Sequence, residues 1–163
     1  MLSLVKLLPE GLRYQALFRI GMSSIPMMGY VRPRLIEHSP EKVVVRINRS
    51  RRTKNAYNSL FLGALAVGGD IAAGFFPMKF MFETGHRTIP IMKSASAEYY
   101  KRVGTYAHFT CTQGVELYEL CRKVVDTGER LEATIVIIVT APAEFGDEPV
   151  AKITQVVSLK KLG

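Results

Sequence analysis

The sequence predicts an α+β fold in which an antiparallel sheet wraps around one buried helix. The central observation is an apolar stretch, residues 58–76, that contains four glycines and a single charged residue, Asp70. The segments on either side of it alternate between apolar and polar residues, as strands with one buried face do. The chain has 163 residues, of which 48% are hydrophobic and 22% charged. These values suit one folded domain, which we expect to span residues 1–163.

The chain is expected to begin with a helical segment, about residues 1–28. Leu12, Leu17 and Ile20 recur on one face of such a helix. Its apolar run is interrupted by Pro9 and by neighbouring charges, so it is too short for a signal peptide or a transmembrane helix. We therefore favour an amphipathic helix and expect no transmembrane segment, with weak docking on a membrane surface as the alternative.

Strands are predicted both before and after the central helix. Residues 43–48 have strand periodicity, and a basic loop, residues 50–57, follows them. Beyond the helix the pattern predicts four strands at 89–101, 104–112, 131–141 and 150–159, and a short helix at 115–125 with Gly128 as its C-cap. The order is then helix, two strands, buried helix, two strands, short helix and two strands, which is typical of an antiparallel α+β fold.

The central helix has its own start and stop signals. Asn58 or Ser59 can cap it, and Pro77 is expected to end it. Each glycine in a helix interior costs about 1 kcal/mol relative to alanine, so four of them require a large compensating burial. Small residues also permit the close approach of another backbone. We therefore expect the sheet to pack tightly around residues 59–76.

Metal and disulfide chemistry are not expected. Cys111 and Cys121 are ten residues apart and form no C-x-x-C pair, so we interpret them as buried thiols of a cytoplasmic protein. The three histidines, His38, His86 and His108, show no metal-ligand spacing. His108 alternates within a predicted strand and could face a site, but a core or surface histidine is the favoured interpretation.

This layout resembles the hotdog fold, in which an antiparallel sheet wraps a long central helix. The similarity is to the phenylacetyl-CoA thioesterase-like group, and within it to a branch labelled as a domain of unknown function. The motif of that group is an Asn, then His-Gly-Gly-Ala-Leu six residues later, then an Asp nine residues after the His. The matching positions here are Asn55, Gly63, Ala64, Leu65 and Asp70, whereas Phe61 replaces the His and Leu62 the first Gly.

The resemblance implies roles for four residues. Asp70 would be the general base or nucleophile, and Asn55 would orient the water or the thioester. The backbone N–H groups of Leu62 and Gly63, in the first turn of the helix, would polarise the carbonyl. The alternatives are a structural carboxylate at Asp70 and a simple turn residue at Asn55. Since Phe61 cannot donate a hydrogen bond, either the backbone acts alone or hydrolysis has been lost.

The resemblance also implies partners. Hotdog proteins of this kind form homodimers or dimers of dimers with sites between subunits, so Asn55 of one chain would face Asp70 of the other. Arg51, Arg52 and Lys54 would meet CoA phosphates, with a solvated surface as the alternative. Phe61 would contact the substrate. An apolar run could line an acyl pocket, although core packing is the more frequent use of such residues: Phe75, Phe76, Met78, Phe80, Met81 and Phe82.

The leading functional hypothesis is an acyl-CoA thioesterase that hydrolyses a fatty or aryl acyl thioester, on CoA or a carrier protein, without metal or organic cofactor. The second is a non-catalytic acyl-CoA or lipid-binding hotdog protein, motivated by the missing motif His. The third is a nucleic-acid-associated protein, because the net charge is +8 and the pI about 9.7. Nucleic acid is not expected, because aromatic residues do not interleave with the basic ones.

Overall fold

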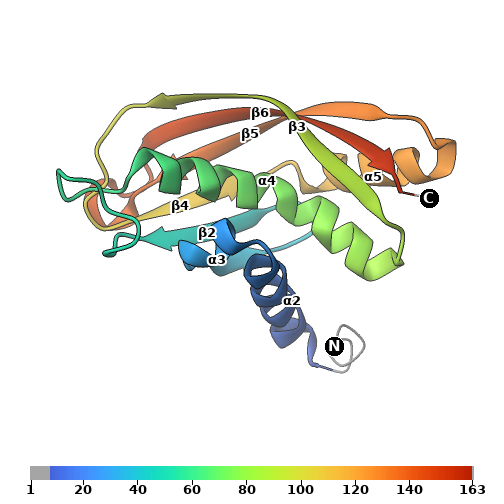
Figure 1. Cartoon of the computed structure of the whole chain (residues 1–163), viewed down its shortest axis with the longest axis horizontal. Coiled ribbons are helices and arrows are strands. Elements are labelled where there is room, and N and C mark those ends of the chain that lie inside the picture. The colour runs from blue at the N-terminus through green and yellow to red at the C-terminus, as the bar shows by residue number, and fades with distance from the viewer. Residues whose placement is uncertain (1–7, 163) are drawn as a thin grey trace.

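The computed structural model describes residues 8–162, and the predicted helical segment at residues 1–7 lies outside them. Within residues 8–162, two helices precede the first strand, and a long helix separates the second strand from the third (Figure 1). The helices are α2 (Glu10–Ser24), α3 (Pro26–Tyr30), α4 (Leu62–Thr84), α5 (Gly114–Thr127) and α6 (Pro142–Phe145). The strands are β1 (Arg34–His38), β2 (Val43–Asn48), β3 (Thr88–Tyr99), β4 (Tyr106–Cys111), β5 (Leu131–Thr140) and β6 (Pro149–Lys161).

The strands form one antiparallel sheet in the order β1-β2-β4-β5-β6-β3. Helix α4 runs along this sheet and contacts β2, β3, β4, β5 and β6 (Figure 1). The predicted fold class, an antiparallel sheet around a central helix, is confirmed. β3 is an edge strand, paired on one side with β6, and nearly all of its residues are exposed.

Glycines allow α4 to lie close to the sheet. A Cβ atom at Gly68 would come within 2.4 Å of the ring of Phe109 on β4, and one at Gly69 within 2.8 Å of Ile153 on β6. Both partner side chains are buried, so neither can move aside without disturbing the core. The predicted close packing therefore holds at these two positions.

The predicted ends of the central helix are wrong. The N-cap is Phe61, because Asn58 has a positive φ of 59° and Ser59 is buried in a turn closed by Asn55. Pro77 lies inside the helix, which continues to Thr84. A proline removes one helical hydrogen bond, but burial of the aromatic side chains on the turns around it compensates for that loss. The helix ends at Gly85, whose φ of 77° is a left-handed C-cap.

The N-terminal helical segment is divided and extends beyond residue 28. The helix breaks at Ile25, which is extended because it precedes Pro26. The buried face of α2 consists of Tyr14, Leu17 and Phe18, whereas Leu12, predicted on that face, is 59% exposed. Gly21 lets this helix approach α4, since a Cβ there would meet the sulfur of a methionine on α4 at 2.9 Å.

Two further observations concern the cysteines and the length and hydropathy of α4. Cys111 and Cys121 are free and buried as predicted, and burial raises the pKa of the Cys121 thiol to about 12. Helix α4 is long and apolar enough to cross a membrane by length and composition alone. However, 56% of its apolar window is buried within the protein, as in the core helix of a folded domain.

Candidate active site

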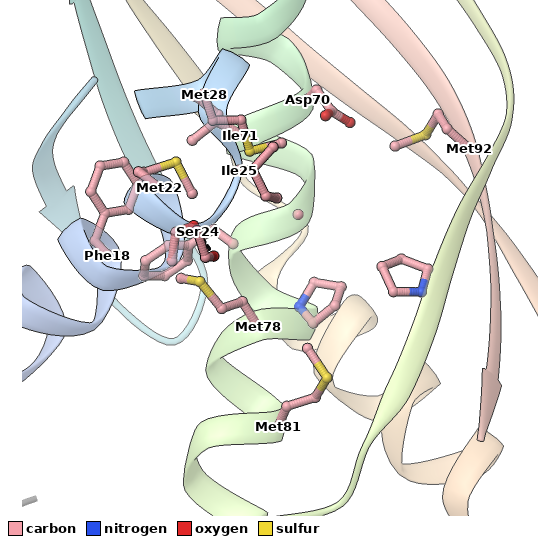
Figure 2. Close-up of a pocket in the computed structure, with 15 residues that line it drawn as sticks. Phe18, Met22, Ser24, Ile25, Met28, Asp70, Ile71, Met78, Met81 and Met92 are labelled. Carbon is pink, nitrogen blue, oxygen red and sulfur yellow. Dashed lines mark hydrogen bonds between the residues drawn. The ribbon is translucent and has the colours of Figure 1, made fainter. Parts of the chain in front are cut away.

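An apolar cavity of about 450 Å³ lies beside the middle of α4. Figure 2 shows its walls, which come from α2 and α3 on one side, α4 in the centre and β3 on the other. Apart from Ser24 and Asp70, the lining consists of apolar residues and glycines: Phe18, Gly21, Met22, Ile25, Met28, Ile71, Gly74, Phe75, Pro77, Met78, Met81, Pro90 and Met92. The cavity is therefore built mainly for an apolar ligand.

Asp70 lies at one end of this cavity. Figure 2 shows its carboxylate pointing away from α4 toward the strand that carries Met92. Within residues 8–162 it makes no hydrogen bond and no ion pair, and desolvation by burial raises its pKa above the ordinary value of 3.8. A carboxylate without a partner in a partly apolar environment is costly, so its presence needs a functional or structural reason.

A second cavity, of about 390 Å³, lies at the N-terminus of α4. Its lining includes two residues predicted for the site, Asn55 and Leu62, together with Tyr57, Ser59, Leu60, Leu65, Tyr99, Lys101, Arg102 and Val103. The two cations belong to the segment that follows β3. They were not predicted for the site, because no motif or spacing in the sequence distinguishes them from other surface charges.

The first turn of α4 has two unused backbone donors. The carbonyl of Phe61 accepts hydrogen bonds from the N–H groups of Ala64 at 2.9 Å and Leu65 at 3.1 Å. The N–H groups of Leu62 and Gly63 have no acceptor within the described part of the chain. Free donors at a helix N-terminus favour a partial negative charge on a ligand.

Asn55 holds the loop that leads into α4. Its Oδ1 accepts hydrogen bonds from the backbone N–H of Tyr57 at 2.9 Å and of Ser59 at 3.1 Å. Its Nδ2 donates to the Ser59 hydroxyl at 3.0 Å, which leaves one amide hydrogen free. The loop is pinned further along by the bond from the N–H of Phe61 to the carbonyl of Thr53 at 2.8 Å. Asn55 thus fixes the turn, and one of its donors remains free for a ligand.

One chain does not bring the predicted catalytic residues together. Leu62 and Asp70 are separated by eight residues of α4, which is about 12 Å along the helix axis. Asn55 and Leu62 line the second cavity, whereas Asp70 lines the first. A single water molecule cannot bridge that separation.

The predicted substrate-binding residues are on the surface. Arg51, Arg52 and Lys54 are exposed and line neither of these cavities. The guanidinium carbon of Arg52 lies 5.3 Å from the ring centre of Tyr30. Phe61, which replaces the motif His, is 54% exposed beside the first turn of α4. Its ring lies over Gly63, where a Cβ would come within 2.6 Å of it.

The aromatic and methionine run divides between the cavity and the core. Phe75, Met78 and Met81 line the cavity. Phe76 and Phe80 are 1% and 3% exposed, and they pack in the core. The partly buried Phe82 packs against that core. The contribution of α2 and α3 to the cavity was not predicted, because a helical pattern alone does not show which segment a helix packs against.

His108 does not belong to either cavity. Its ring centre lies 5.2 Å from that of Tyr106, and its Nε2 is buried without a hydrogen-bond partner. Burial, with a smaller contribution from the charge of Arg46, lowers its pKa. Among residues 8–162, no three His, Cys, Asp or Glu side chains are grouped so that they could hold a metal ion.

Comparison with known proteins gives one family and a set of similar structures. The family described as domain of unknown function (DUF4442) matches residues 14–156. A Pseudomonas aeruginosa protein of unknown function, described as a "Probable Thioesterase", has 16% identity and a TM-score of 0.74, with 95% of this chain and 97% of that chain covered. No curated protein matches the sequence.

Two further structures have the same fold. A protein of unknown function from Chlorobaculum tepidum has 11% identity and a TM-score of 0.78, with 92% of this chain and 96% of that chain covered. A mutant thioesterase from Pseudomonas aeruginosa has 9% identity and a TM-score of 0.67, with 91% and 94% covered. At these identities the similarity shows the fold alone, which is the predicted hotdog fold.

Proposed function

This chain belongs to the family described as domain of unknown function (DUF4442), and from that premise we propose that it hydrolyses acyl thioesters of CoA or of a carrier protein. The observation that carries the proposal is Asp70, an ionisable side chain that lies at one end of an apolar cavity and has no partner in the described part of the chain. Proteins of the same fold are named as thioesterases, which supports the same class of reaction here.

Thioester hydrolysis needs an attacking group and donors for the developing oxyanion. Asp70 is the general base that activates water, or the nucleophile itself. Desolvation raises its pKa, so its carboxylate is a stronger base than that of an exposed aspartate. The adjoining cavity holds the acyl group and keeps bulk water away from it.

The oxyanion is held by the first turn of α4. The N–H groups of Leu62 and Gly63 are free to donate to the thioester oxygen, and the helix N-terminus adds a favourable field. Backbone donors replace the motif His, because Phe61 has no donor to offer. Asn55 keeps the loop in place, and its remaining amide hydrogen can reach the thioester or the water.

Two copies of the chain are needed to complete such a site. Asp70 lies too far along α4 from Leu62 for both to act on one carbonyl within a single chain. In the proposed homodimer, or dimer of dimers, Asp70 of one copy faces Asn55 and the first turn of α4 of the other. The long exposed edge of β3 supports this assembly, since antiparallel pairing with a second copy satisfies its free backbone groups.

The exposed basic residues are proposed to contact the CoA phosphates. If Arg51, Arg52 and Lys54 dock them, replacing all three with alanine raises KM far more than it lowers kcat. Each exposed charge contact is worth about 0.2–1 kcal/mol, so the triple variant raises KM by roughly three-fold or more. An unchanged KM would show that these three residues are solvated and do not contact CoA. Lys101 and Arg102 would then be the next candidates for binding the phosphates.

The test of the proposed function is release of free thiol from acyl-CoA substrates of increasing chain length. We expect the wild type to release thiol and Asp70→Asn to lower kcat by about 10²–10⁴, the usual contribution of a positioned base. Asp126→Asn is the matched control, because it makes the same chemical change at an exposed position on α5. Equal rates of thiol release by wild type and Asp70→Asn would show that Asp70 has a structural role and no role in catalysis.

The second candidate function is a non-catalytic acyl-CoA or lipid-binding protein. The observation that favours it is Phe61 at the position of the motif His. Binding of acyl-CoA by the wild type without turnover at any chain length would select this function over hydrolysis.

A further inference from the structure

Resting on the proposed function, we propose that the cavity beside Asp70 binds a flexible aliphatic acyl chain rather than a rigid aryl group, and that Gly74 sets the length of chain that fits. The inference rests on the residues that form the walls of the cavity, on its polarity and on the unfilled space at this glycine.

Methionine is the most frequent residue in the accessible wall of the cavity, which also includes the exposed Ile25 and Pro90. Five methionines line it, and each is only partly buried: Met22 and Met28 from the N-terminal helices, Met78 and Met81 from α4, and Met92 from β3. Phe18 and Phe75, in contrast, are each 1% exposed and pack in the core. Unbranched thioether side chains adapt to ligands that take many conformations, as an alkyl chain does.

The polarity of the cavity orients the ligand. The Ser24 hydroxyl donates to the carbonyl of Gly21 at 2.7 Å, so its one hydrogen is already used. Asp70 is then the charged side chain of the lining, and it has no partner among residues 8–162. From Asp70 to Met81 the cavity follows α4 for eleven residues, about 16 Å along its axis. A ligand with its reacting carbonyl at Asp70 and its tail among the methionines matches this arrangement.

Gly74 lies one turn beyond Asp70 on the cavity side of α4. A Cβ built there meets no atom of residues 8–162 within 4 Å, whereas one built at Gly63, Gly68 or Gly69 would collide with a side chain. Apart from proline, glycine is the least favourable residue in a helix interior, and no contact within the described chain requires it at position 74. The space is therefore available to the ligand, and a side chain there would shorten the cavity.

The test measures binding rather than turnover. Butyryl-, octanoyl-, dodecanoyl- and phenylacetyl-CoA are titrated into the full-length Asp70→Asn protein by calorimetry. Burial of each methylene is expected to tighten Kd by about four-fold until the cavity is full. Phenylacetyl-CoA is expected to bind more weakly than octanoyl-CoA. Affinity that is independent of chain length, or an aryl ligand that binds as tightly as octanoyl-CoA, would overturn the proposal.

A leucine at position 74 tests the length limit. In the same background, Gly74→Leu is expected to abolish the gain in affinity from butyryl- to dodecanoyl-CoA while butyryl binding is kept. Ala143→Leu adds a leucine at an exposed position on α6 and is expected to change none of the affinities. If Gly74→Leu does not fold, Met28→Trp narrows the cavity from α3 and is expected to have the same effect. Unchanged dodecanoyl binding in the folded variant would contradict the proposal.

Two measurements separate this inference from the proposed function. If the wild type releases no thiol, hydrolysis fails while the dependence of binding on chain length still stands. If the wild type hydrolyses acyl-CoA and Gly74→Leu keeps the same chain-length preference, the inference fails alone. Light scattering identifies the remaining case. Loss of a wild-type dimer in Gly74→Leu would show that a second copy occupies this space, and would overturn the assignment to a ligand.

Discussion

The two halves of α4 place their glycines in different surroundings. In the first half, Gly68 and Gly69 face buried side chains of the sheet, and a Cβ atom at either would collide with them. In the second half, Gly74 faces a cavity, and a Cβ there would touch nothing within the described chain. The same residue type therefore serves packing before Asp70 and leaves room for a ligand after it.

The two halves also carry different parts of the proposed chemistry. The first turn offers free N–H donors, whereas Asp70 begins the half that borders the cavity. The predicted effects below follow from this division. Substitutions at the start of the helix should affect the reaction or the packing, and substitutions beyond Asp70 should affect the cavity.

Among substitutions elsewhere on α4 than Asp70, the largest effect is expected from Leu62→Pro. Proline is well tolerated as the first helical residue, and Phe61 before it is already extended, so the variant should fold. It removes the N–H proposed to hold the oxyanion, and we expect kcat to fall by about 10²–10³. Leu62→Ala shortens the same side chain but keeps the N–H. Equal kcat values for these two variants would remove this donor from the mechanism.

Gly68→Ala is expected to destabilise the protein. The added methyl group lies within 2.4–2.7 Å of three ring atoms of Phe109, which is fully buried. Overpacking of this kind costs about 1–3 kcal/mol, measurable as a lower free energy of unfolding in urea. A variant as stable as the wild type would show that the sheet and α4 can separate more easily than their packing indicates.

Gly74→Ala is expected to have a smaller effect of opposite sign. Alanine fits the open space without a clash and favours the helix, so the free energy of unfolding should rise by up to about 1 kcal/mol. Denaturation under the same conditions as for Gly68→Ala compares the two positions directly. Destabilisation would mean that position 74 is packed against something in solution.

The pH dependence of stability tests the environment of Asp70. Burial raises its folded-state pKa above 3.8, so the folded protein binds the proton more tightly than the unfolded chain. Stability contributed by this group is therefore lost as the pH rises from about 3.8 through the raised pKa. Asp70→Asn should become more stable relative to wild type over that window. If the difference in free energy of unfolding between Asp70→Asn and wild type does not change with pH, the Asp70 carboxylate is exposed to solvent.

The sequence predicted the sheet and the central helix because their periodicity depends on local burial. The ends of α4 could not be predicted in the same way. Pro77 is a strong local stop signal, yet the helix continues beyond it because Phe76 and Phe80 are buried in the core. The predicted start of the helix at Asn58 or Ser59 was also wrong. These residues belong to a turn that the Asn55 side chain closes by accepting hydrogen bonds from the N–H groups of Tyr57 and Ser59.

Within the candidate site, the sequence pointed to Asp70 but not to the geometry around it. Asp70 was identified as a lone charge in an apolar stretch, and that stretch proved to border the cavity. The wall formed by α2 and α3 depends on a contact between distant segments, including Gly21 against Met78. No pattern within either segment encodes that contact.

The central claim is that Asp70 of one copy acts with the first turn of α4 of another. It is tested by co-expressing Leu62→Pro and Asp70→Asn under two different affinity tags and purifying the heterodimer through both. In such a dimer one of the two sites carries both substitutions and the other carries neither. We expect the heterodimer to recover about half of the wild-type kcat per dimer, although each variant alone is nearly inactive. A heterodimer no more active than the two variants alone would contradict it.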